Sequence, residues 1–259
     1  MARVLLYQFE TFQRPGLLHA VTTSCGGHSR GGIQGLNLGR TTGDDPASVE
    51  ANHRALYERL LIAPSQVVSA SQVHGAHVAR VTAADGGAVM PETDGLISDT
   101  PGLALLMRFA DCVPVLLYDA RRRAVGLAHA GWRGALAGVA TNTVIAMQRA
   151  YGCSPDDLQA GLGPSIGPCC FEVGPEVVQQ VRETCADSNR LITRQQPNGH
   201  AWLNLWGLVE AQLRALGLKH IESARLCTAC RHDLFYSYRR QGAASGRLAA
   251  VIGLQAIDV

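Results

Sequence analysis

Short apolar runs alternate along the chain with longer amphipathic stretches, and Gly and Pro residues separate them. Apolar runs of four to eight residues bounded by turn residues are typical of buried β-strands. The pattern predicts strands at 67–73, 77–81, 103–109, 114–118 and 124–130.

The amphipathic stretches carry apolar residues at the spacing of a helix face. They predict helices at 50–61, 134–150, 175–185 and 205–216. Pro175 stands where a first helical turn accepts proline, and Gly152 and Gly217 stand where helices end. Because no repeat, linker or break in composition divides the chain, we expect one α+β or mixed α/β domain over residues 1–259.

The run from Arg108 to Asp119 resembles a buried strand, but Asp111 and Cys112 interrupt it. The strands on either side of 119–123 are close enough to form a hairpin. If its turn centres between residues 121 and 122, His129 lies opposite Pro114, and Cys112 shares a face with His129. Diagonal neighbours of this kind lie about 7–8 Å apart. A turn shifted by one residue would place them on opposite faces.

His74 lies at a strand end beside Gly75, where a side chain is presented at the rim of a sheet. Two imidazoles and one thiolate, from His74, His129 and Cys112, make a set of three metal ligands. Three ligands leave a fourth position open, as catalytic zinc requires. The alternative is that Cys112 is a small buried hydrophobe and each histidine is only hydrogen-bonded.

Composition excludes several classes of protein. The chain has 259 residues, is 47% hydrophobic and carries a net charge of +2, so nothing indicates a nucleic-acid partner. The apolar stretch near the N-terminus covers only residues 4–7, too short for a signal core or a membrane span, so we expect a cytoplasmic protein. Its oligomeric state is open.

The eight cysteines are too sparse for a disulfide scaffold in a chain of this length. Cys227 and Cys230 have zinc-ribbon spacing but lack a second pair of that kind, so the sequence favours a structural or incidental role. Cys169 and Cys170 are adjacent, a poor geometry for a disulfide, and are interpreted as reduced thiols in a Gly-Pro loop.

An ordered set of motifs resembles the laccase-domain, YfiH-like family. This family was first named for polyphenol oxidase activity and later described as purine nucleoside phosphorylases. The motifs are QVHG at 72–75, ETDG at 92–95, ADCVP at 110–114, AHAGWRG at 128–134, GPSIGPCCFEVG at 163–174 and FYSYRR at 235–240. They run in order from GLNLG at 35–39 over nearly the whole chain.

The resemblance implies mixed sheets packed between helical layers, an α/β/β/α arrangement. It also implies a zinc ion held by His74, Cys112 and His129. The implied activities are phosphorolysis of adenosine, inosine and methylthioadenosine, together with hydrolytic deamination of adenosine. Nucleosides and phosphate are then the partners, and Cys112 and His129 belong to the catalytic centre.

Further residues are candidates for this chemistry. Asp111 is the nearest proton carrier, and its alternative role is to accept a backbone hydrogen bond or orient a ligand. Arg133, Arg240 and Arg247 are candidates for phosphate, although long basic side chains are usually solvated. Asn37 and Gln72 are candidates for sugar or base, with turn building as the alternative.

Three other functions fit part of the pattern. A copper-dependent polyphenol oxidase also uses two His and one Cys, usually with a weak axial Met, and Met107 is the nearest one. A metal-free hydrolase would use Cys112 as nucleophile and His129 as base, acting on amides or cell-wall precursors. In a protein without enzymatic activity, the zinc would be purely structural.

Overall fold

The structure is a computed structural model, and it describes residues 3–256. Two large sheets form its centre. The first sheet has the strand order β1 (Leu6–Tyr7), β2 (Leu17–Thr22), β17 (Leu248–Leu254), β9 (Ala104–Phe109), β5 (Val67–Ala70) and β7 (Val89–Met90). The second sheet has the order β16 (His220–Ser223), β12 (Leu158–Leu162), β10 (Val113–Asp119), β11 (Ala124–Ala130), β8 (Gly95–Ser98) and β6 (Val78–Arg80). Both mix parallel and antiparallel pairs.

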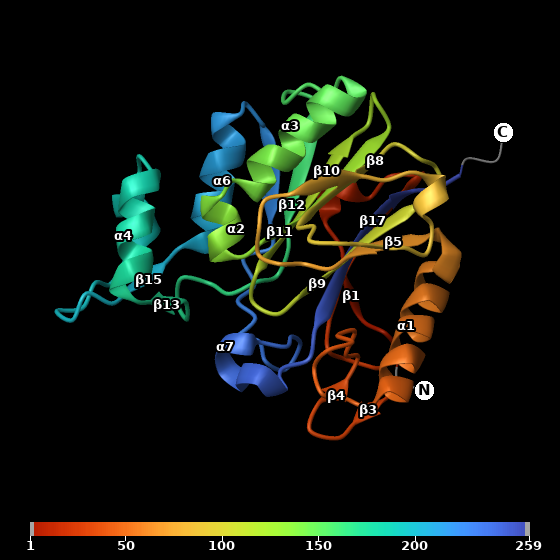
Figure 1. The fold of residues 1–259 in the computed structure, drawn as a ribbon, viewed down its shortest axis with the longest axis horizontal. Helices are drawn as coiled ribbons and strands as arrows, with labels where there is room; N and C mark the ends of the chain where they lie inside the picture. The colour runs from red at the N-terminus through yellow and green to blue at the C-terminus, as the bar shows by residue number, and fades with distance from the viewer. Residues whose placement is uncertain (1–2, 257–259) are drawn as a thin grey trace.

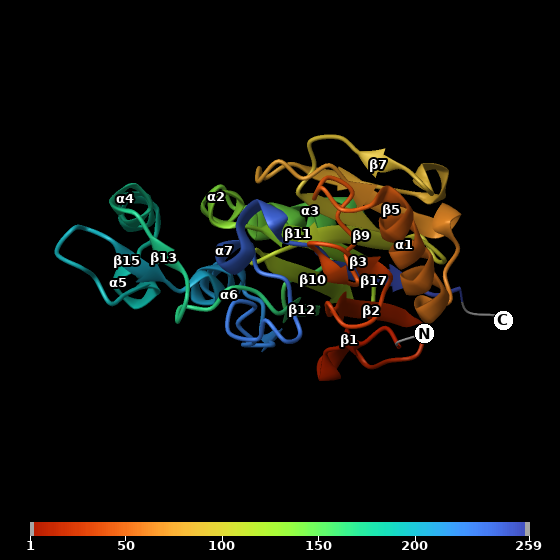
Figure 2. The same ribbon diagram turned by 90° about the horizontal axis from the view of Figure 1, so that it is seen from below.

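Helices cover the outer faces of both sheets, as Figures 1 and 2 show. On the first sheet lies α1 (Pro46–Leu60), and on the second lie α2 (Trp132–Leu136), α3 (Val139–Tyr151) and α6 (Leu205–Ala215). A third hydrophobic cluster fills the space between the sheets. The layers are therefore α/β/β/α, which confirms the mixed α/β fold expected from the sequence.

Smaller elements surround this sandwich. A three-stranded sheet stands to one side of the large sheets in both views, together with α4 and α5. These elements are β13 (Glu172–Val173), β15 (Ala201–Leu203), β14 (Ile192–Thr193), α4 (Pro175–Thr184) and α5 (Ser188–Leu191). The rest are β3 (Ser29–Arg30), β4 (Gln34–Gly35), α7 (Tyr238–Gln241), η1 (Glu10–Phe12), η2 (Pro64–Gln66), η3 (Ala83–Asp85) and η4 (Gly242–Ala244).

Strand β10 is buried on both faces, which explains its unbroken apolar sequence. Val115 and Leu117 pack against the helices, whereas Leu116 and Tyr118 pack between the sheets. In β11, His129 has the same parity as Leu127, which belongs to the layer between the sheets. An imidazole is therefore placed at the end of the space between the two sheets.

The predicted hairpin register is confirmed. Strands β10 and β11 pair antiparallel, with Pro114 opposite His129 and Val113 opposite Ala130. The link between them spans 120–123, and Arg123 adopts a left-handed φ of 50°. The turn chemistry thus holds Cys112 and His129 toward the same end of the sandwich.

The run from Arg108 to Asp119 is not one interrupted strand, as its pattern suggested. It contains the end of β9 in the first sheet and all of β10 in the second. Residues 110–112 carry the chain from one sheet to the other. Asp111 and Cys112 are tolerated in this apolar run because they lie in a crossing, where no strand ladder has to continue.

Two other crossings lie at the same end of the sandwich. In chain order, residues 71–77 form the first crossing and connect β5 to β6, and residues 91–94 form the second and connect β7 to β8. Residues 110–112 form the third, and all three run from the first sheet to the second. Strands β5, β7 and β9 run parallel to one another, so their carboxyl ends lie at the same end of the first sheet, and the chain leaves the sheet there each time. This topology gathers residues near 74, 94 and 112, which are distant in sequence.

The helices at 50–61, 175–185 and 205–216 are confirmed within a few residues of their predicted ends. The predicted helix at 134–150 is wrong in one respect, because it is two helices, α2 and α3. Gly138 separates them with a left-handed φ of 79°, which a continuous helix does not permit. Among the described residues, no helix is long and apolar enough to cross a membrane.

Candidate metal centre in an arginine-lined pocket

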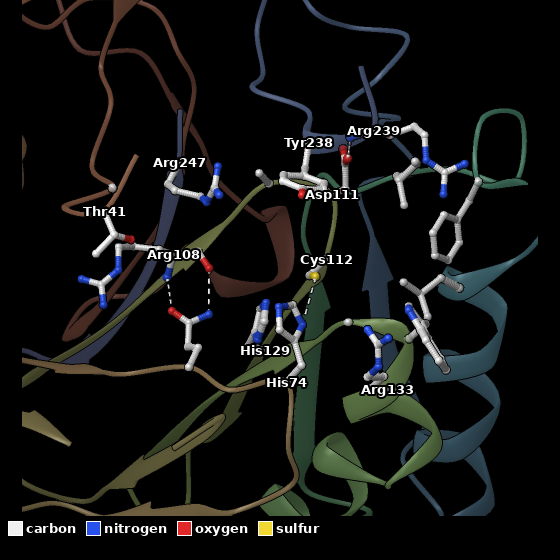
Figure 3. Close-up of a pocket in the computed structure, with 18 of the residues that line it drawn as sticks. Thr41, His74, Arg108, Asp111, Cys112, His129, Arg133, Tyr238, Arg239 and Arg247 are labelled. Atoms are coloured by element: carbon white, nitrogen blue, oxygen red, sulfur yellow. Dashed lines mark hydrogen bonds between the residues drawn. The ribbon is translucent and has the colours of Figure 1, made fainter. Parts of the chain in front are cut away.

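A pocket of about 700 Å³ opens at the end of the sandwich where the three crossings meet. Its volume is in the range of small-molecule sites. His74, Cys112 and His129 line one part of it, and five arginines line much of the rest. Figure 3 shows the imidazoles and the thiol pointing toward one another.

The three predicted ligands converge. One ligand atom from each of His74, Cys112 and His129 lies within 4.8 Å of the others. Cys112 Sγ is 4.0 Å from His74 Nδ1, and the two imidazole rings have centroids 4.8 Å apart. His77, the competing histidine, is not in this group and lines a different pocket.

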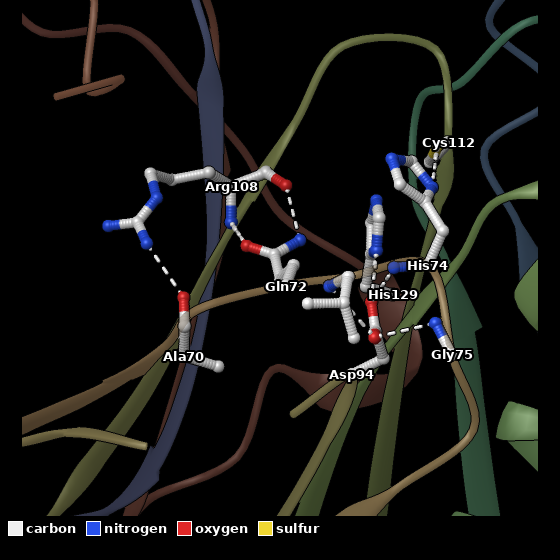
Figure 4. Close-up of polar contacts among 9 residues, drawn as sticks. Ala70, Gln72, His74, Gly75, Asp94, Arg108, Cys112 and His129 are labelled. Atoms are coloured by element: carbon white, nitrogen blue, oxygen red, sulfur yellow. Dashed lines mark hydrogen bonds and ion pairs between the residues drawn. The ribbon is translucent and has the colours of Figure 1, made fainter. Parts of the chain in front are cut away.

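Asp94 lies behind the ligands and is the site residue that sequence reasoning missed (Figure 4). It is fully buried, and its Oδ1 is 2.8 Å from His129 Nδ1. This contact directs Nε2 of His129 into the pocket, as carboxylates do for metal-binding histidines. The signal was present in the ETDG motif, in which Asp94 is the last residue of the connection from β7 to β8.

The same carboxylate also holds the loop that carries His74. The backbone N–H groups of Val73, His74 and Gly75 donate to Asp94 at 3.1, 3.1 and 2.8 Å. They stabilise His74 in a left-handed conformation with φ of 60°, which costs a residue with a Cβ about 1 kcal/mol. Asp94 therefore fixes two of the three donor groups at once.

Gly131 keeps the space beside the donors open. A Cβ at this position would lie 2.8 Å from His74 Nδ1 and 2.9 Å from Cys112 Sγ, closer than Cβ atoms come to other heavy atoms. The donors are one thiol and two imidazoles, which suit zinc, and a zinc ion binds such ligands at about 2.0–2.3 Å. The residues present therefore fit a small metal ion of this kind.

The electrostatics of the site favour charged donors. Burial alone raises the pKa of the Cys112 thiol, but the charge of His129 and hydrogen bonds to both histidines outweigh it and lower the pKa to about 6. Burial lowers the pKa of His129, but the Cys112 charge and the Asp94 hydrogen bond raise it to about 9. Without metal, the thiolate and imidazolium form an ion pair at neutral pH.

Asp111 lines the pocket in a left-handed conformation with φ of 83°, yet its carboxylate already has partners. Thr228 Oγ1 donates to one oxygen at 2.6 Å, and the backbone N–H of Arg239 donates to the other at 2.5 Å. These contacts match the alternative role foreseen for Asp111, which is to accept hydrogen bonds. They also tie the third crossing to the start of α7.

The pocket contains a different set of arginines from the predicted one. Arg133 and Arg247 line it, but Arg240 does not and is exposed on α7. The other lining arginines are Arg40, Arg108 and Arg239. Because α7 is a single helical turn, consecutive residues on it face different directions, and the FYSYRR motif alone could not show which arginine faces inward.

Arg133 differs from the other lining arginines in the partners of its guanidinium. Its guanidinium lies 4.3 Å from the Trp132 ring and donates no hydrogen bond among the described residues. By contrast, Arg108 donates to Ala70 O at 2.7 Å, and Arg247 donates to Ser245 O at 2.6 Å. The guanidinium of Arg133 therefore has its donors available for a ligand.

The two predicted amide groups have structural partners. Gln72 lines the pocket, but its amide exchanges hydrogen bonds with the backbone of Arg108 at 2.8 and 2.9 Å. Asn37 is fully buried, and the pocket lining does not include it. Its Oδ1 accepts from the N–H groups of Gly39 and Arg247, both of which line the pocket. Asn37 thus positions pocket residues without contacting the space itself.

Comparison with known proteins identifies the family of this chain. A family model described as "Multi-copper polyphenol oxidoreductase laccase" matches residues 18–255, and the chain belongs to this family. The resemblance seen in the motifs is thereby confirmed.

Individual relatives carry names from nucleoside metabolism. "Purine nucleoside phosphorylase YlmD" of Geobacillus stearothermophilus is 38% identical over 247 residues, which cover 92% of this chain and 90% of that protein. The crystal structure of YlmD from the same organism matches with a TM-score of 0.90 at 37% identity, covering 96% of this chain and 94% of that one. "Adenosine deaminase RL5" from an unknown prokaryotic organism is 34% identical over 227 residues, 84% of this chain and 86% of that protein. These names support an enzyme of nucleoside metabolism.

Proposed function

We propose that this chain is a zinc-dependent purine nucleoside phosphorylase that accepts adenosine, inosine and methylthioadenosine and also deaminates adenosine. The observation that carries the proposal is one pocket in which three zinc-type donors and five arginines line a common space. The names of the relatives support purine nucleosides as substrates of phosphorolysis and adenosine as a substrate of deamination. One domain spanning residues 1–259 and a location in the cytoplasm belong to this proposal.

His74, Cys112 and His129 would hold the zinc, with Asp94 bonded to the His129 imidazole and to the backbone N–H of His74. When bound, zinc supplies Lewis acidity and lowers the pKa of a coordinated water toward neutrality. Asp94 keeps His129 in the tautomer whose Nε2 is free to bind the metal.

The arginines would hold the phosphate that phosphorolysis consumes. Forked guanidinium groups bind phosphate through paired hydrogen bonds. Arg133, with its donors available, is the first candidate, and Arg247 and Arg239 add charge to the same pocket. Phosphate held beneath C1′ of the ribose would attack as the bond to the purine breaks.

Other lining residues would hold the nucleoside. Trp132 and Tyr238 present aromatic rings to the pocket on which a purine can stack. Gln72 would contribute only through the backbone it supports, because its amide is already bonded to Arg108. We infer that Asp111 positions Thr228 and Arg239 instead of carrying a proton.

The test is to incubate protein of known metal content with adenosine, with and without phosphate, and to identify the products. Adenine and ribose 1-phosphate are expected only with phosphate, whereas inosine is expected in both reactions and is converted in part to hypoxanthine when phosphate is present. The Cys112→Ala variant should lose the zinc of this pocket and more than about 100-fold of both activities, because a ligand matters more than its supporting residues. Full activity in that variant would reject the proposal.

A metal-free hydrolase is the second candidate, and one observation favours it. The site has the arrangement of a cysteine hydrolase, with Cys112 as nucleophile, His129 as base and Asp94 as the acid that orients the base. Turnover of an amide that survives chelation, with a covalent adduct on Cys112, would support this reading.

The copper oxidase is less favoured. Among the described residues that line the pocket, no methionine offers an axial ligand, and Met107 is fully buried between the sheets.

A further inference from the structure

Four cysteines from two distant segments meet outside the nucleoside pocket. Cys169 and Cys170 lie between β12 and β13, and Cys227 and Cys230 lie between β16 and α7. All four sulfur atoms lie within 4.8 Å of one another. The sequence did not predict this cluster, because each pair lacks a partner until the fold joins segments about sixty residues apart.

The spacing of the sulfur atoms matches a tetrahedral metal site. Cys230 Sγ lies 3.5 Å from Cys169 Sγ and 3.4 Å from Cys170 Sγ. A zinc ion bound by four thiolates at about 2.3 Å places its sulfur atoms about 3.8 Å apart, by tetrahedral geometry. A disulfide needs a separation of about 2.05 Å, and all the cysteines here are free.

The backbone around the cluster supports its geometry. The N–H of Gly167 donates to Cys227 Sγ at 3.3 Å, a contact that holds the sulfur in place. A Cβ on Gly167 would lie 3.2 Å from Cys169 Sγ and 2.8 Å from the Trp206 ring, so the loop needs glycine here. Two of the cysteines are exposed and one is buried, which leaves the cluster open to a metal from solvent.

We propose that Cys169, Cys170, Cys227 and Cys230 form a second, structural zinc site. Its four protein ligands complete the coordination, so it holds the fold and performs no chemistry, in contrast to the open set at His74. The proposal does not depend on the nucleoside activity, because it concerns a separate group of residues.

The second site would connect the segment that carries Cys169 and Cys170 to the segment that carries Cys227 and Cys230, and these segments form one wall of the pocket. Ser165 and Cys227 already pair in a parallel bridge. Next to the four cysteines in the sequence, Ile166 and Phe171 line the pocket, and Thr228 donates to Asp111. Zinc at the four cysteines would therefore order residues that shape the pocket from outside it.

The test is zinc content per chain, measured by elemental mass spectrometry on protein purified under reducing conditions. The wild-type protein is expected to hold about two zinc ions, one per donor cluster. Cys230→Ser and Cys112→Ala should each retain about one, by loss of different sites. Cys185→Ser is the matched control, since Cys185 is also a partly exposed free thiol but lies outside the cluster, and it should retain both ions.

Cobalt substitution provides a second readout that does not depend on activity. Cobalt bound to the Cys112→Ala protein should show the intense sulfur charge-transfer absorption of a tetrathiolate site. Adding Cys169→Ser to this variant should weaken that absorption. Cys169 and Cys230 are both exposed, so both serine variants are expected to fold, and each tests the cluster independently of the other. Full zinc retention in Cys169→Ser and Cys230→Ser would overturn the proposal. A mass two hydrogens low, which shows a disulfide in the cluster, would also overturn it.

Discussion

The two donor clusters of this protein use the same element, sulfur, in opposite surroundings. At the pocket, one thiol lies with two imidazoles, and a buried carboxylate bonds to one ring and to the backbone of the other histidine. At the four-cysteine cluster, thiols contact thiols, and no histidine or acid belongs to the group. Three ligands in a pocket leave a position for chemistry, whereas four ligands close it. The difference shows that the neighbours of a cysteine, more than the cysteine itself, decide its role.

The sharpest contrast concerns thiol reactivity in the metal-free protein. The pKa of Cys112 is lowered to about 6, so its thiolate predominates above that pH. Loss of solvation and hydrogen bonds to Cys227 and Cys230 raise the pKa of Cys169 to about 11. At pH 7, iodoacetamide should modify Cys112 about 100-fold faster, after allowing for the weaker nucleophilicity of the more acidic thiol.

Peptide-resolved mass spectrometry after chelation measures both rates in one sample. The Cys112 rate should rise through pH 6 and then level off. A midpoint near the usual thiol pKa, or equal rates at the two cysteines, would remove the contrast.

The next largest effect is expected at Asp94. Asp94→Asn keeps the size of the side chain but weakens the contact to His129 and removes the negative charge that holds the 73–75 loop. Loss of such a supporting carboxylate reduces zinc affinity or turnover by about 10- to 100-fold. Competition with a chelator of known affinity gives the zinc affinity directly.

Asp119 provides a matched control for this variant. It is also fully buried and accepts two backbone N–H groups, where Asp94 accepts three, but it lies at the far end of β10. Asp119→Asn should lower stability without changing zinc affinity. Equal loss of zinc affinity in both variants would mean that Asp94 acts only on folding.

The smallest expected effect is a change in the KM for phosphate, which should differ between variants of two exposed arginines, Arg133 and Arg240. Arg133→Ala should raise the KM for phosphate about 10-fold, the cost of losing one charge-assisted hydrogen bond, while deamination without phosphate continues. Arg240→Ala should change neither, because Arg240 does not line the pocket. Steady-state kinetics on both variants test this. An effect at Arg240 alone would restore the prediction made from its motif.

The sequence predicted the local parts of this site well. The hairpin register followed from the length of one link, and it correctly placed His129 opposite Pro114. The alternation of strands and helices indicated the class of fold. Both depend on contacts between residues that are close in sequence, where spacing determines geometry.

Features that depend on topology could not be predicted in this way. Asp94 lies behind His129 only because the second crossing follows the same route as the first and third. Arg239 faces the pocket and Arg240 does not because of where α7 sits. The four cysteines meet because two loops at one end of the second sheet pack together. No spacing in the sequence encodes these contacts.

The crossings between the sheets have a mechanical consequence. His74, Asp94 and Cys112 each occupy a different connection between the same two sheets, so their relative positions are set by how one sheet sits upon the other. A slide of one sheet past its neighbour would move all three connections together and pull the ligands away from His129. The positions of the ligands therefore depend on the packing between the sheets. Replacing a large side chain buried there by a smaller one would weaken ion binding before the chain unfolds.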